Sequence, residues 1–444
     1  MTSMLTSDRS ESTRESAPPA ARADVLVACP DARPPAYQAA AALAAAGRLA
    51  SFVTSIYYDE NGPIARLLRR FVPHRFERIR RILERRRDPA IPTARVIRSP
   101  AFDLSLQLEI RMPRGWAGLR RMLALRRVDR FDRRLARIVE RVRPSTLLVF
   151  SDVGSRRTLP LCRALGIRTV VSMVTGEVGE EREILERQER LEPAWFPIYL
   201  GSGTIDRDEI AMLHERRRLD AALADRILVP SEHIKNRLID SGTPAERIRV
   251  VPYAADTSRF RPAERPAIAG ECTFLFAGGI AQRKGIKYLL DAWDRIARPG
   301  LRLQLLGGLP LDPGPLAGRL ERVELLGRVG HEEVAARMSQ ADIFVFPSLF
   351  EGSAVVTYEA MACGLPLVTT PNAGSIARDG VEALIVPAGD VDRLAEAMLR
   401  LADDLPLRLR MARAARSRAL AFDWSRHHDD LLAQIRELDP EAEA

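Results

Sequence analysis

Two glutamates in the stretch ADIFVFPSLFEGSAVVTYEAMACGLPLVTTPNAG, residues 341–374, have the types and the spacing to do chemistry. Glu351 falls in an expected loop and Glu359 in the helix expected over 354–363, with seven residues between them. A carboxylate accepts well from sugar hydroxyls, whereas a helix N-terminus with its free N–H groups suits an anionic group. Together they suggest a nucleotide sugar as ligand. Taken singly, each glutamate is better explained as an ordinary charge, one near the helix dipole and one on the surface.

The elements around these glutamates are predicted from apolar runs and helix-stop signals. Residues 343–346 form a short continuous apolar run, which is typical of a buried parallel strand. Gly364 suits a helix C-cap, and 367–370 form the next strand. Polar groups therefore gather at the carboxyl ends of parallel strands, where doubly wound sheets bind ligands. Gly352 and Gly374 are expected to let a ligand approach the backbone closely.

Length and composition predict a two-domain α/β protein. The chain has 444 residues, of which 46% are hydrophobic and 29% charged, and no apolar run approaches the ~20 residues that span a bilayer. Residues 1–22 lack an apolar signal core and are expected to be a disordered tail. The four cysteines are scattered without metal-like spacing, so we expect buried free thiols in a reducing cytoplasm. They are Cys29, Cys162, Cys272 and Cys363.

The formal net charge of +9 comes from arginines that concentrate at 66–87 and 111–137. Nucleic-acid binding is disfavoured, because no recognisable nucleic-acid module accompanies the charge and aromatic residues make up only 6%. Leu, Ile and Phe alternate with Arg in ARLLRRFVPHRFERIRRILERRR, which favours peripheral contact with an anionic membrane. A solvated face of arginine-rich helices is the other interpretation, and both remain open.

Strands and helices alternate along the chain, which predicts parallel sheets covered on both faces. The expected strands are 24–29, 49–55, 94–98, 146–150, 168–173, 225–230, 249–252, 273–277, 301–306, 323–326, 343–346, 367–370 and 383–386. The expected helices are 37–46, 64–87, 119–143, 155–165, 180–223 with a break near 200, 231–240, 285–297, 332–339, 354–363, 391–402 and 405–438 with a break at 422–424. Residues 257–270, rich in Pro, Ala and charge, suit a linker between domains.

Five blocks of sequence, in order, resemble the retaining glycosyltransferases of family 4. FVFPSLFEGSAVVTYEAMACGLPLV resembles the family's signature, with the E-x7-E pattern at Glu351 and Glu359. The other blocks are DRILVPSEHIKNRLIDSG, RIRVVPYAADTSRF, FAGGIAQRKGIKYLLDAW and DWSRHHDDLL. The resemblance covers about Asp225 to Leu438 and is looser before that.

The resemblance implies a GT-B architecture, in which two Rossmann-like domains face each other across a cleft. Residues 23–256 would form the N-terminal, acceptor-binding domain, and 271–420 the C-terminal domain that binds the nucleotide sugar. Residues 421–444 would form a C-terminal helix that crosses back to the first domain. The implied partners are a nucleotide-sugar donor and a glycan or lipid-linked acceptor, and no nucleic acid. The expected location is the cytoplasm, with peripheral contact on the inner membrane face as the alternative.

Carried over residue by residue, the resemblance also implies a binding site. Arg283 and Lys284 would neutralise the diphosphate, and Glu351 would contact the donor sugar's hydroxyls. The Gly-rich strand end before Arg283 agrees with this role, because phosphate could lie close to the backbone there. Glu359 would accept from the ribose, and Arg328 would lie near the base. The remaining expected cofactor-site residues are Gly278, Gly279, Gly352, Ser353 and Ala354.

The implied reaction is transfer of a sugar to an acceptor hydroxyl with retention, in polysaccharide or glycolipid synthesis. The cations would stabilise the departing diphosphate, with no metal and no cofactor beyond the donor. Gly279 occupies a position where many members have arginine, and Arg283 would replace it. The expected histidine of the first domain is also missing, since Thr175-Gly176-Glu177 fills that region. Asp152 could be a cleft residue or a helix cap.

Three other functions were weighed against this one. A catalytically inactive protein of the same fold, binding nucleotide sugar or serving as a scaffold, gains support from the missing histidine and from Gly279. A nucleotide-sugar epimerase of the GT-B fold is disfavoured by the RKG and E-x7-E blocks. A Rossmann dehydrogenase is disfavoured because no G-x-G-x-x-G follows a strand.

Overall fold

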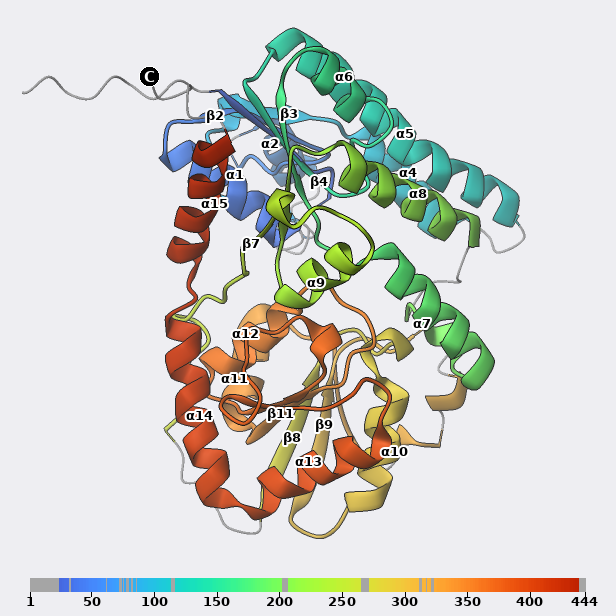
Figure 1. The fold of residues 1–444 in the computed structure, drawn as a ribbon, viewed down its shortest axis with the longest axis vertical. Coiled ribbons are helices and arrows are strands. Elements are labelled where there is room, and N and C mark those ends of the chain that lie inside the picture. The colour runs from blue at the N-terminus through green and yellow to red at the C-terminus, as the bar shows by residue number, and fades with distance from the viewer. Residues whose placement is uncertain are drawn as a thin grey trace, which may run out of the picture.

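Two parallel β-sheets, one in each half of the chain, organise the structure (Figure 1). The computed structural model describes residues 24–438, except 32, 61, 72–73, 75, 77–79, 81–82, 85, 113–115, 202–206, 265–270, 311–313, 317 and 321–322. The expected disordered tail at 1–22 and much of the expected linker therefore lie outside the described residues.

The N-terminal sheet has seven parallel strands in the order β3-β2-β1-β4-β5-β6-β7. Its central strands are buried along their whole length, which explains their continuous apolar sequences. All seven strands occur within about two residues of the expected positions. Their bounds are β1 Val25–Ala28, β2 Leu49–Thr54, β3 Val96–Arg98, β4 Thr146–Phe150, β5 Arg168–Ser172, β6 Arg226–Val229 and β7 Ile248–Val250.

Helices cover both faces of this sheet, and one of them differs from the expectation. Helix α2, Pro63–Phe71, forms the first part of the helix expected over 64–87; the rest of that span lies partly outside the described residues, and its described residues His74, Phe76, Arg80, Leu83 and Glu84 are helical too. Helix α4, Ala101–Arg111, was not expected at all. The bounds are α1 Pro34–Ala45, α2 Pro63–Phe71, α5 Ala117–Val142, α6 Thr158–Ala164, α7 Val178–Leu191, α8 Arg207–Leu223 and α9 Glu232–Asp240, with the short helix η3 at Phe196–Ile198.

The C-terminal sheet has six parallel strands in the order β10-β9-β8-β11-β12-β13. Each of the six strands was expected from its apolar run. Their bounds are β8 Cys272–Ala277, β9 Leu301–Leu306, β10 Glu324–Gly327, β11 Ile343–Phe346, β12 Leu367–Thr369 and β13 Ala383–Ile385. The helices that cover this sheet are α10 Ile286–Ile296, α11 His331–Gln340, α12 Val355–Ala362, α13 Val391–Asp403 and α14 Leu405–Leu420. The short helix η5, Gln282–Lys284, precedes α10.

The last helix, α15 Trp424–Leu438, leaves the C-terminal domain and packs on α1 of the N-terminal domain (Figure 1). Arg226 of β6 lies 3.0 Å from the carboxylate of Glu437, and His428 lies 2.8 Å from the side chain of Gln38. The break between α14 and α15 was expected at 422–424 and occurs there. The crossing back of the C-terminal helix is therefore part of the fold.

A second segment also crosses between the domains, and sequence patterns gave no hint of it. Trp195, Ile198 and Tyr199 precede the linker, yet they are buried in the same hydrophobic core as the C-terminal sheet. The side chain of Gln188 on α7 hydrogen-bonds Tyr288 and Gln282 of the C-terminal domain, both at 2.8 Å. The segment from α7 to η3 thus joins the two domains along one side of the molecule.

Among the described residues, no helix is both long enough and apolar enough to cross a membrane. All four cysteines are buried and free, as expected.

Candidate functional site

A cavity of about 390 Å³ opens at the carboxyl ends of β8, β9, β10 and β11. The strand order reverses between β8 and β11, which makes this edge the topological switch point of the C-terminal sheet. The cavity is lined by Ala277, Gly278, Gly279, Lys284, Leu306, Gly307, Gly308, Gly327, Arg328, Val329, Val334, Glu351, Ser353, Ala354, Val355, Val356 and Glu359. Eight of the ten residues expected at the site are in this lining; Arg283 and Gly352 are not.

Lys284 and Glu351 form the charged centre of the cavity. The ammonium nitrogen of Lys284 lies 2.7 Å from a carboxylate oxygen of Glu351 and 5.0 Å from the centre of the Phe346 ring. Burial acts to raise the pKa of Glu351, but the charges of Lys284 and Arg283 outweigh it and hold the pKa below its ordinary value. Glu351 is therefore ionised at neutral pH, and it fixes the direction in which Lys284 points.

Arg283 supports the Glu351 loop from behind the cavity. Its guanidinium donates to the carbonyl oxygen of Phe350 at 2.9 Å and lies 3.5 Å from the carboxylate of Glu351. Its backbone N–H donates to the carbonyl oxygen of Tyr199, and its carbonyl oxygen accepts from Leu349. The structure thus gives Arg283 a contact with Glu351 and places it outside the cavity lining.

Glycines shape the floor of the cavity next to Lys284. Gly285 has a φ of +76°, and a Cβ there would overlap the carbonyl oxygen of Pro347. This tight contact fixes where η5 ends and α10 begins. Gly278, with a φ of +146°, lies beside the aliphatic part of Lys284. A Cβ at Gly279 would meet nothing within 4 Å, so this position faces open space.

The loop before α12 does not supply all the N–H groups that were expected from it. The N–H of Ala354 donates to the carbonyl oxygen of Ala373 at 2.9 Å and is not free for a ligand. Gly352 is packed between the domains, since a Cβ there would overlap the carbonyl oxygen of Val174. The close approach that Gly352 allows is therefore to the backbone of the other domain, and its contact with a ligand stays a prediction.

Gly374 is likewise occupied by protein atoms. It has a φ of +63°, and a Cβ there would overlap the carbonyl oxygen of Gly352. Its own carbonyl accepts from the hydroxyl of Ser353 at 2.7 Å. The first turn of α12, with Val355 and Val356, does line the cavity. The helix therefore still presents its positive end to this space.

Glu359 and Arg328 also line the cavity. Burial raises the pKa of Glu359 to about 7, and the more distant Arg259 only partly offsets this. Arg328 is exposed, with its guanidinium over Gly308. No acidic side chain of the described residues pairs with Arg328. Both residues thus keep polar groups available to a ligand. The described part of the chain contains no group of three His, Cys, Asp or Glu side chains placed to hold a metal ion.

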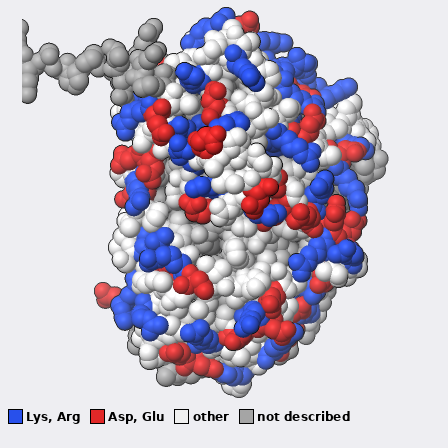
Figure 2. All heavy atoms as spheres, in the orientation of Figure 1, with Lys and Arg blue, Asp and Glu red and all other residues white. Residues whose placement is uncertain are grey.

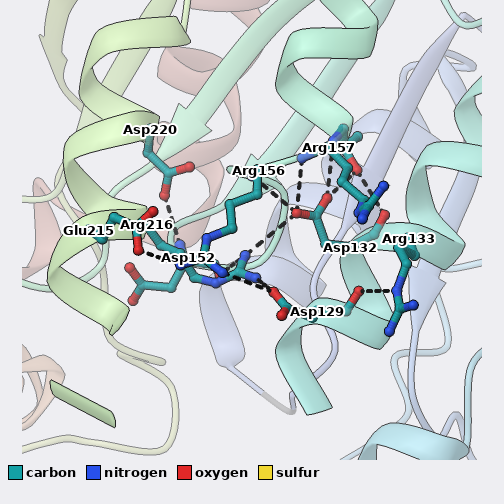
Figure 3. Close-up of polar contacts among 10 residues, drawn as sticks. Asp129, Asp132, Arg133, Asp152, Arg156, Arg157, Glu215, Arg216 and Asp220 are labelled. Atoms are coloured by element: carbon teal, nitrogen blue, oxygen red, sulfur yellow. Dashed lines mark hydrogen bonds and ion pairs between the residues drawn. The ribbon is translucent and has the colours of Figure 1, made fainter. Parts of the chain in front are cut away.

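In the N-terminal domain, Asp152 directly follows β4 and some residues near it are drawn in Figure 3. It lies at the switch point of the N-terminal sheet, between β1 and β4. Its φ of +76° is unusual for a non-glycine residue. The residue is held by α8: its N–H donates to Asp220 at 2.8 Å, and its carboxylate lies 3.3 Å from Arg217. Burial raises the pKa of Asp152, against the lowering effect of Arg217 and Arg33.

The alternative that Asp152 caps a helix is wrong. The N-terminus of α6 is instead capped by Asp132 of α5, whose carboxylate accepts from the N–H groups of Arg156, Arg157 and Thr158 (Figure 3). Asp132 is almost fully buried, so this cap also joins α5 to α6. The contribution of Asp132 has no local sequence signal, because the cap and the helix lie more than twenty residues apart.

Contacts between the domains also reach the site, and sequence reasoning missed them. The hydroxyl of Ser231 donates to the carbonyl oxygen of Gly352 at 2.9 Å, besides capping α9 as expected. Gly176 packs against the ring of Phe350, where a Cβ would not fit. The residues on both sides of Glu351, Phe350 and Gly352, are therefore held by residues of the N-terminal domain.

Comparison with known proteins agrees with this architecture. A family model described as glycosyl transferases group 1 matches residues 271–404. The chain is 32% identical over 266 residues to D-inositol 3-phosphate glycosyltransferase of Saccharomonospora viridis, covering 54% of this chain and 61% of that protein. It is 29% identical over 252 residues to alpha-D-kanosaminyltransferase of Streptomyces kanamyceticus, covering 52% and 64%. The matches thus span somewhat under two thirds of these relatives.

Solved structures show the same fold over nearly the whole chain. Sucrose-phosphate synthase from Thermosynechococcus elongatus superimposes with a TM-score of 0.66 at 20% identity, covering 95% of this chain and all of that one. Anabaena HepE, crystallised with UDP and glucose, gives a TM-score of 0.60 at 14% identity, covering 94% of this chain and all of that one. The chain thus has the GT-B fold of these structures, and its residues 271–404 match the family model of group 1 glycosyl transferases.

Proposed function

We propose that the chain is a retaining glycosyltransferase that moves a sugar from a nucleotide-diphosphate sugar to an acceptor hydroxyl. The observation that carries the proposal is the pairing of Lys284 with Glu351 inside a cavity at the switch point of the C-terminal sheet. The cation and the helix N-terminus there suit the two phosphates, and the carboxylate suits the sugar. The relatives named above transfer sugars, and the HepE crystals contain UDP, which supports a nucleotide donor.

Each residue has a role in this proposal that follows from its surroundings. The ammonium of Lys284 and the first turn of α12 would stabilise the negative charge that develops on the diphosphate as the bond to the sugar breaks. Glu351, ionised and oriented by Lys284, would accept from the hydroxyls of the donor sugar. Arg283 would act through Glu351 and Phe350 by holding the loop in place.

Retention follows if the acceptor attacks from the face that the diphosphate leaves. The bond between the anomeric carbon and the phosphate oxygen breaks, and the new bond to the acceptor oxygen forms on the same side. The proton of the acceptor hydroxyl passes to the departing phosphate oxygen. This route uses neither a metal ion nor a further cofactor, and no histidine from the N-terminal domain.

The acceptor belongs to the same proposal. We infer a glycan or lipid-linked acceptor in polysaccharide or glycolipid synthesis, reached from the N-terminal side of the cleft. Peripheral contact with an anionic membrane would bring a lipid-linked acceptor to that side.

A catalytically inactive nucleotide-sugar-binding protein is the second candidate. Gly279 favours it, because no arginine stands on that side of the diphosphate position and a Cβ there would meet nothing within 4 Å. Such a protein would keep the cavity and bind the donor without turning it over.

One experiment separates the two candidates. Thermal-shift measurements with a panel of nucleotide sugars identify the donor, because a ligand that binds only the folded state raises the unfolding temperature. The same donor, labelled in its sugar, is then followed for hydrolysis and for transfer to glycan and lipid-linked acceptors. Binding with turnover supports the enzyme, whereas binding without turnover supports the inactive protein. If none of the nucleotide sugars binds, both candidates fail.

A further inference from the structure

The positive charge of this chain is concentrated in one part of the N-terminal domain. Residues 63–143 contain 24 arginines and eight acidic residues, a net charge of +16, whereas the whole chain carries only +9. The rest of the chain is therefore net acidic, and a general preference for arginine does not explain the cluster. Helices α2, α4 and α5 all lie in this part.

Helix α5 displays five of these arginines as a row on one face. Arg126, Arg130, Arg133, Arg137 and Arg141 are all exposed, and their spacing of three and four residues aligns them along about four turns. No acidic side chain of the described residues forms an ion pair with any of the five. The opposite face, with the same spacing, is buried in the core; it consists of Ala124, Val128, Phe131, Leu135 and Val139.

Large apolar side chains are exposed in the same part of the chain. The four most exposed large hydrophobic residues of the described chain are Phe71, Leu104, Trp116 and Leu108, with 68%, 64%, 57% and 55% of their surface accessible. Leu104 and Leu108 are one turn apart on α4, which packs against α5. Trp116 immediately precedes α5. The hairpin of α4 and α5 therefore combines an apolar edge with a basic row.

This hairpin projects beyond the edge of the N-terminal sheet that faces the C-terminal domain. Helix α4 starts three residues after the carboxyl end of β3, and α5 leads back to the start of β4. With 26 residues α5 is ~39 Å long, whereas the five residues of β4 span only ~17 Å. The N-terminal half of α5 therefore extends past the carboxyl edge of the sheet, which faces the C-terminal domain. Figure 1 shows α4, α5 and α8 side by side, running outward from the N-terminal sheet.

We propose that the α4–α5 hairpin docks on an anionic phospholipid bilayer, with Leu104, Leu108 and Trp116 inserted at the headgroup boundary and the arginine row on the lipid phosphates. The charges are complementary to such a surface, and the apolar side chains gain from leaving water only if the partner has an apolar interior. A nucleic acid would pair with the arginines but leave the leucines in water. A second copy would place one arginine row against another.

The docking surface would hold the mouth of the cleft near the membrane plane. A lipid-linked acceptor could then reach the cleft while its lipid stays in the bilayer. The docking itself does not depend on the proposed glycosyl transfer, because the hairpin shares no residue with the cavity of the C-terminal domain.

Vesicle sedimentation of the full chain tests the proposal. We expect binding to vesicles of phosphatidylcholine with phosphatidylglycerol, little binding to phosphatidylcholine alone, and a loss of binding as salt is raised. The double variant Leu104→Ser/Leu108→Ser should lower the partition coefficient about tenfold or more, since two inserted side chains lose their apolar contact. Arg126→Gln/Arg130→Gln should weaken binding and reduce its salt dependence.

Matched variants elsewhere on the surface serve as controls. Leu409 and Leu420 on α14 are 39% and 50% exposed, so Leu409→Ser/Leu420→Ser removes the same groups outside the hairpin. Arg393→Gln on α13 removes the charge of an exposed arginine outside the hairpin. Both control variants should bind vesicles as the unaltered chain does. Nucleotide-sugar binding should be unchanged in every variant, so failure of the docking proposal and failure of the proposed function are distinguishable.

Four outcomes would overturn the proposal. The first is absence of binding to anionic vesicles. The second is unchanged binding of Leu104→Ser/Leu108→Ser, which would mean a purely electrostatic contact. The third is stronger binding to duplex DNA than to anionic vesicles, insensitive to the leucine changes, which would indicate nucleic acid. The fourth is a dimer in light scattering that the leucine changes convert to a monomer, which would make this face an interface between copies.

Discussion

The carboxylate of Glu351 keeps its charge within the cavity because two cations face it from consecutive residues. Lys284 contacts it from inside the cavity and Arg283 from behind. Before a ligand binds, this pair keeps Lys284 from remaining an uncompensated charge. In the proposed function, a diphosphate that enters the cavity would give the ammonium a second anionic partner without the ammonium having to be brought in from solvent. The pair would thus prepare the cavity for a ligand with both hydroxyls and phosphates.

Replacing either member of this pair should abolish most of the transfer. We expect Glu351→Ala and Lys284→Ala each to lower kcat/KM by about 10²–10³-fold, as loss of an electrostatic contact to the transition state does. Lys235→Ala and Glu396→Ala, which alter exposed ion pairs elsewhere, should leave it unchanged. The measurement is sugar transfer with the donor found by thermal shift, together with the unfolding temperature of each variant. Full activity of either cavity variant would contradict the assignment.

Glu359 should make nucleotide binding depend on pH. Its pKa of about 7 lies above the ordinary value of a glutamate, because burial disfavours the charged form. Ionising it therefore costs stability as the pH rises from about 4.5 through 7, and in the expected contact with the ribose only the ionised form would accept from two hydroxyls. We expect calorimetric affinity for the nucleoside diphosphate to rise about tenfold at most from pH 6 to pH 8.

The control for this pH effect is Glu359→Gln. The phosphates of the ligand titrate in the same pH range, and the glutamine variant retains that contribution. If the variant shows the same pH dependence as the unaltered chain, the effect belongs to the phosphates and not to Glu359.

At the scale of elements, the turn from β8 into α10 decides where Lys284 stands. Gly285 must be glycine, both for its φ of +76° and because a Cβ would meet the backbone at Pro347. Gly279, in the same turn, meets nothing within 4 Å. Gly285 is therefore needed for the fold of the turn, whereas Gly279 leaves space that a ligand could occupy.

The corresponding prediction compares Gly285→Ala with Gly279→Ala. The first should lower stability by about 2 kcal/mol or more, from strain and from displacement of the backbone. The second should change stability by less than about 0.5 kcal/mol, while its methyl group weakens nucleotide binding. Denaturant unfolding and thermal shift with the nucleotide sugar measure the two effects. A Gly279→Ala variant that unfolds as readily as Gly285→Ala would contradict this view of the turn.

Most elements were predictable because buried parallel strands are continuous apolar runs. Helix α4 was not, since Phe102, Leu104, Leu106, Leu108 and Ile110 alternate with polar residues, a period that is typical of a strand. Leu104 and Leu108 remain exposed, so the apolar residues do not follow the helical period. Lys284 and Glu351 could be brought together from sequence, because both follow strands that flank the switch point. The packing of Gly352 on Val174 could not, because contacts between domains leave no local periodicity.

At the scale of the whole molecule, α15 joins the two domains, and the buried His427 lies near the N-terminus of this helix. His427 donates from Nδ1 to the carbonyl oxygen of Pro252 at 2.7 Å and packs against the ring of Trp424. Burial lowers the pKa of His427 to about 4, which the contact with Pro252 partly opposes. The folded state therefore requires this imidazole to be neutral.

This histidine should make stability depend on pH. Its folded pKa is below the unfolded value of about 6.5, so its contribution is present above pH 6.5 and is lost as the pH falls toward 4. Between pH 7 and pH 5 the loss should be about 2 kcal/mol. Denaturant unfolding at both pH values measures it. His427→Gln should show a smaller difference between the two, whereas His74→Gln, on the surface, should not alter it.

Figure 2 shows basic and acidic side chains spread over both domains on the face drawn, so surface charge does not mark where one domain ends. The order of residues along the chain does not separate the two domains either. Trp195, Ile198 and Tyr199 are synthesised before the first strand of the sheet whose core they complete. A ribosome that has released only the first half would expose these three apolar side chains to water. The N-terminal half made alone should therefore aggregate, and the C-terminal half made alone should lack part of its interior.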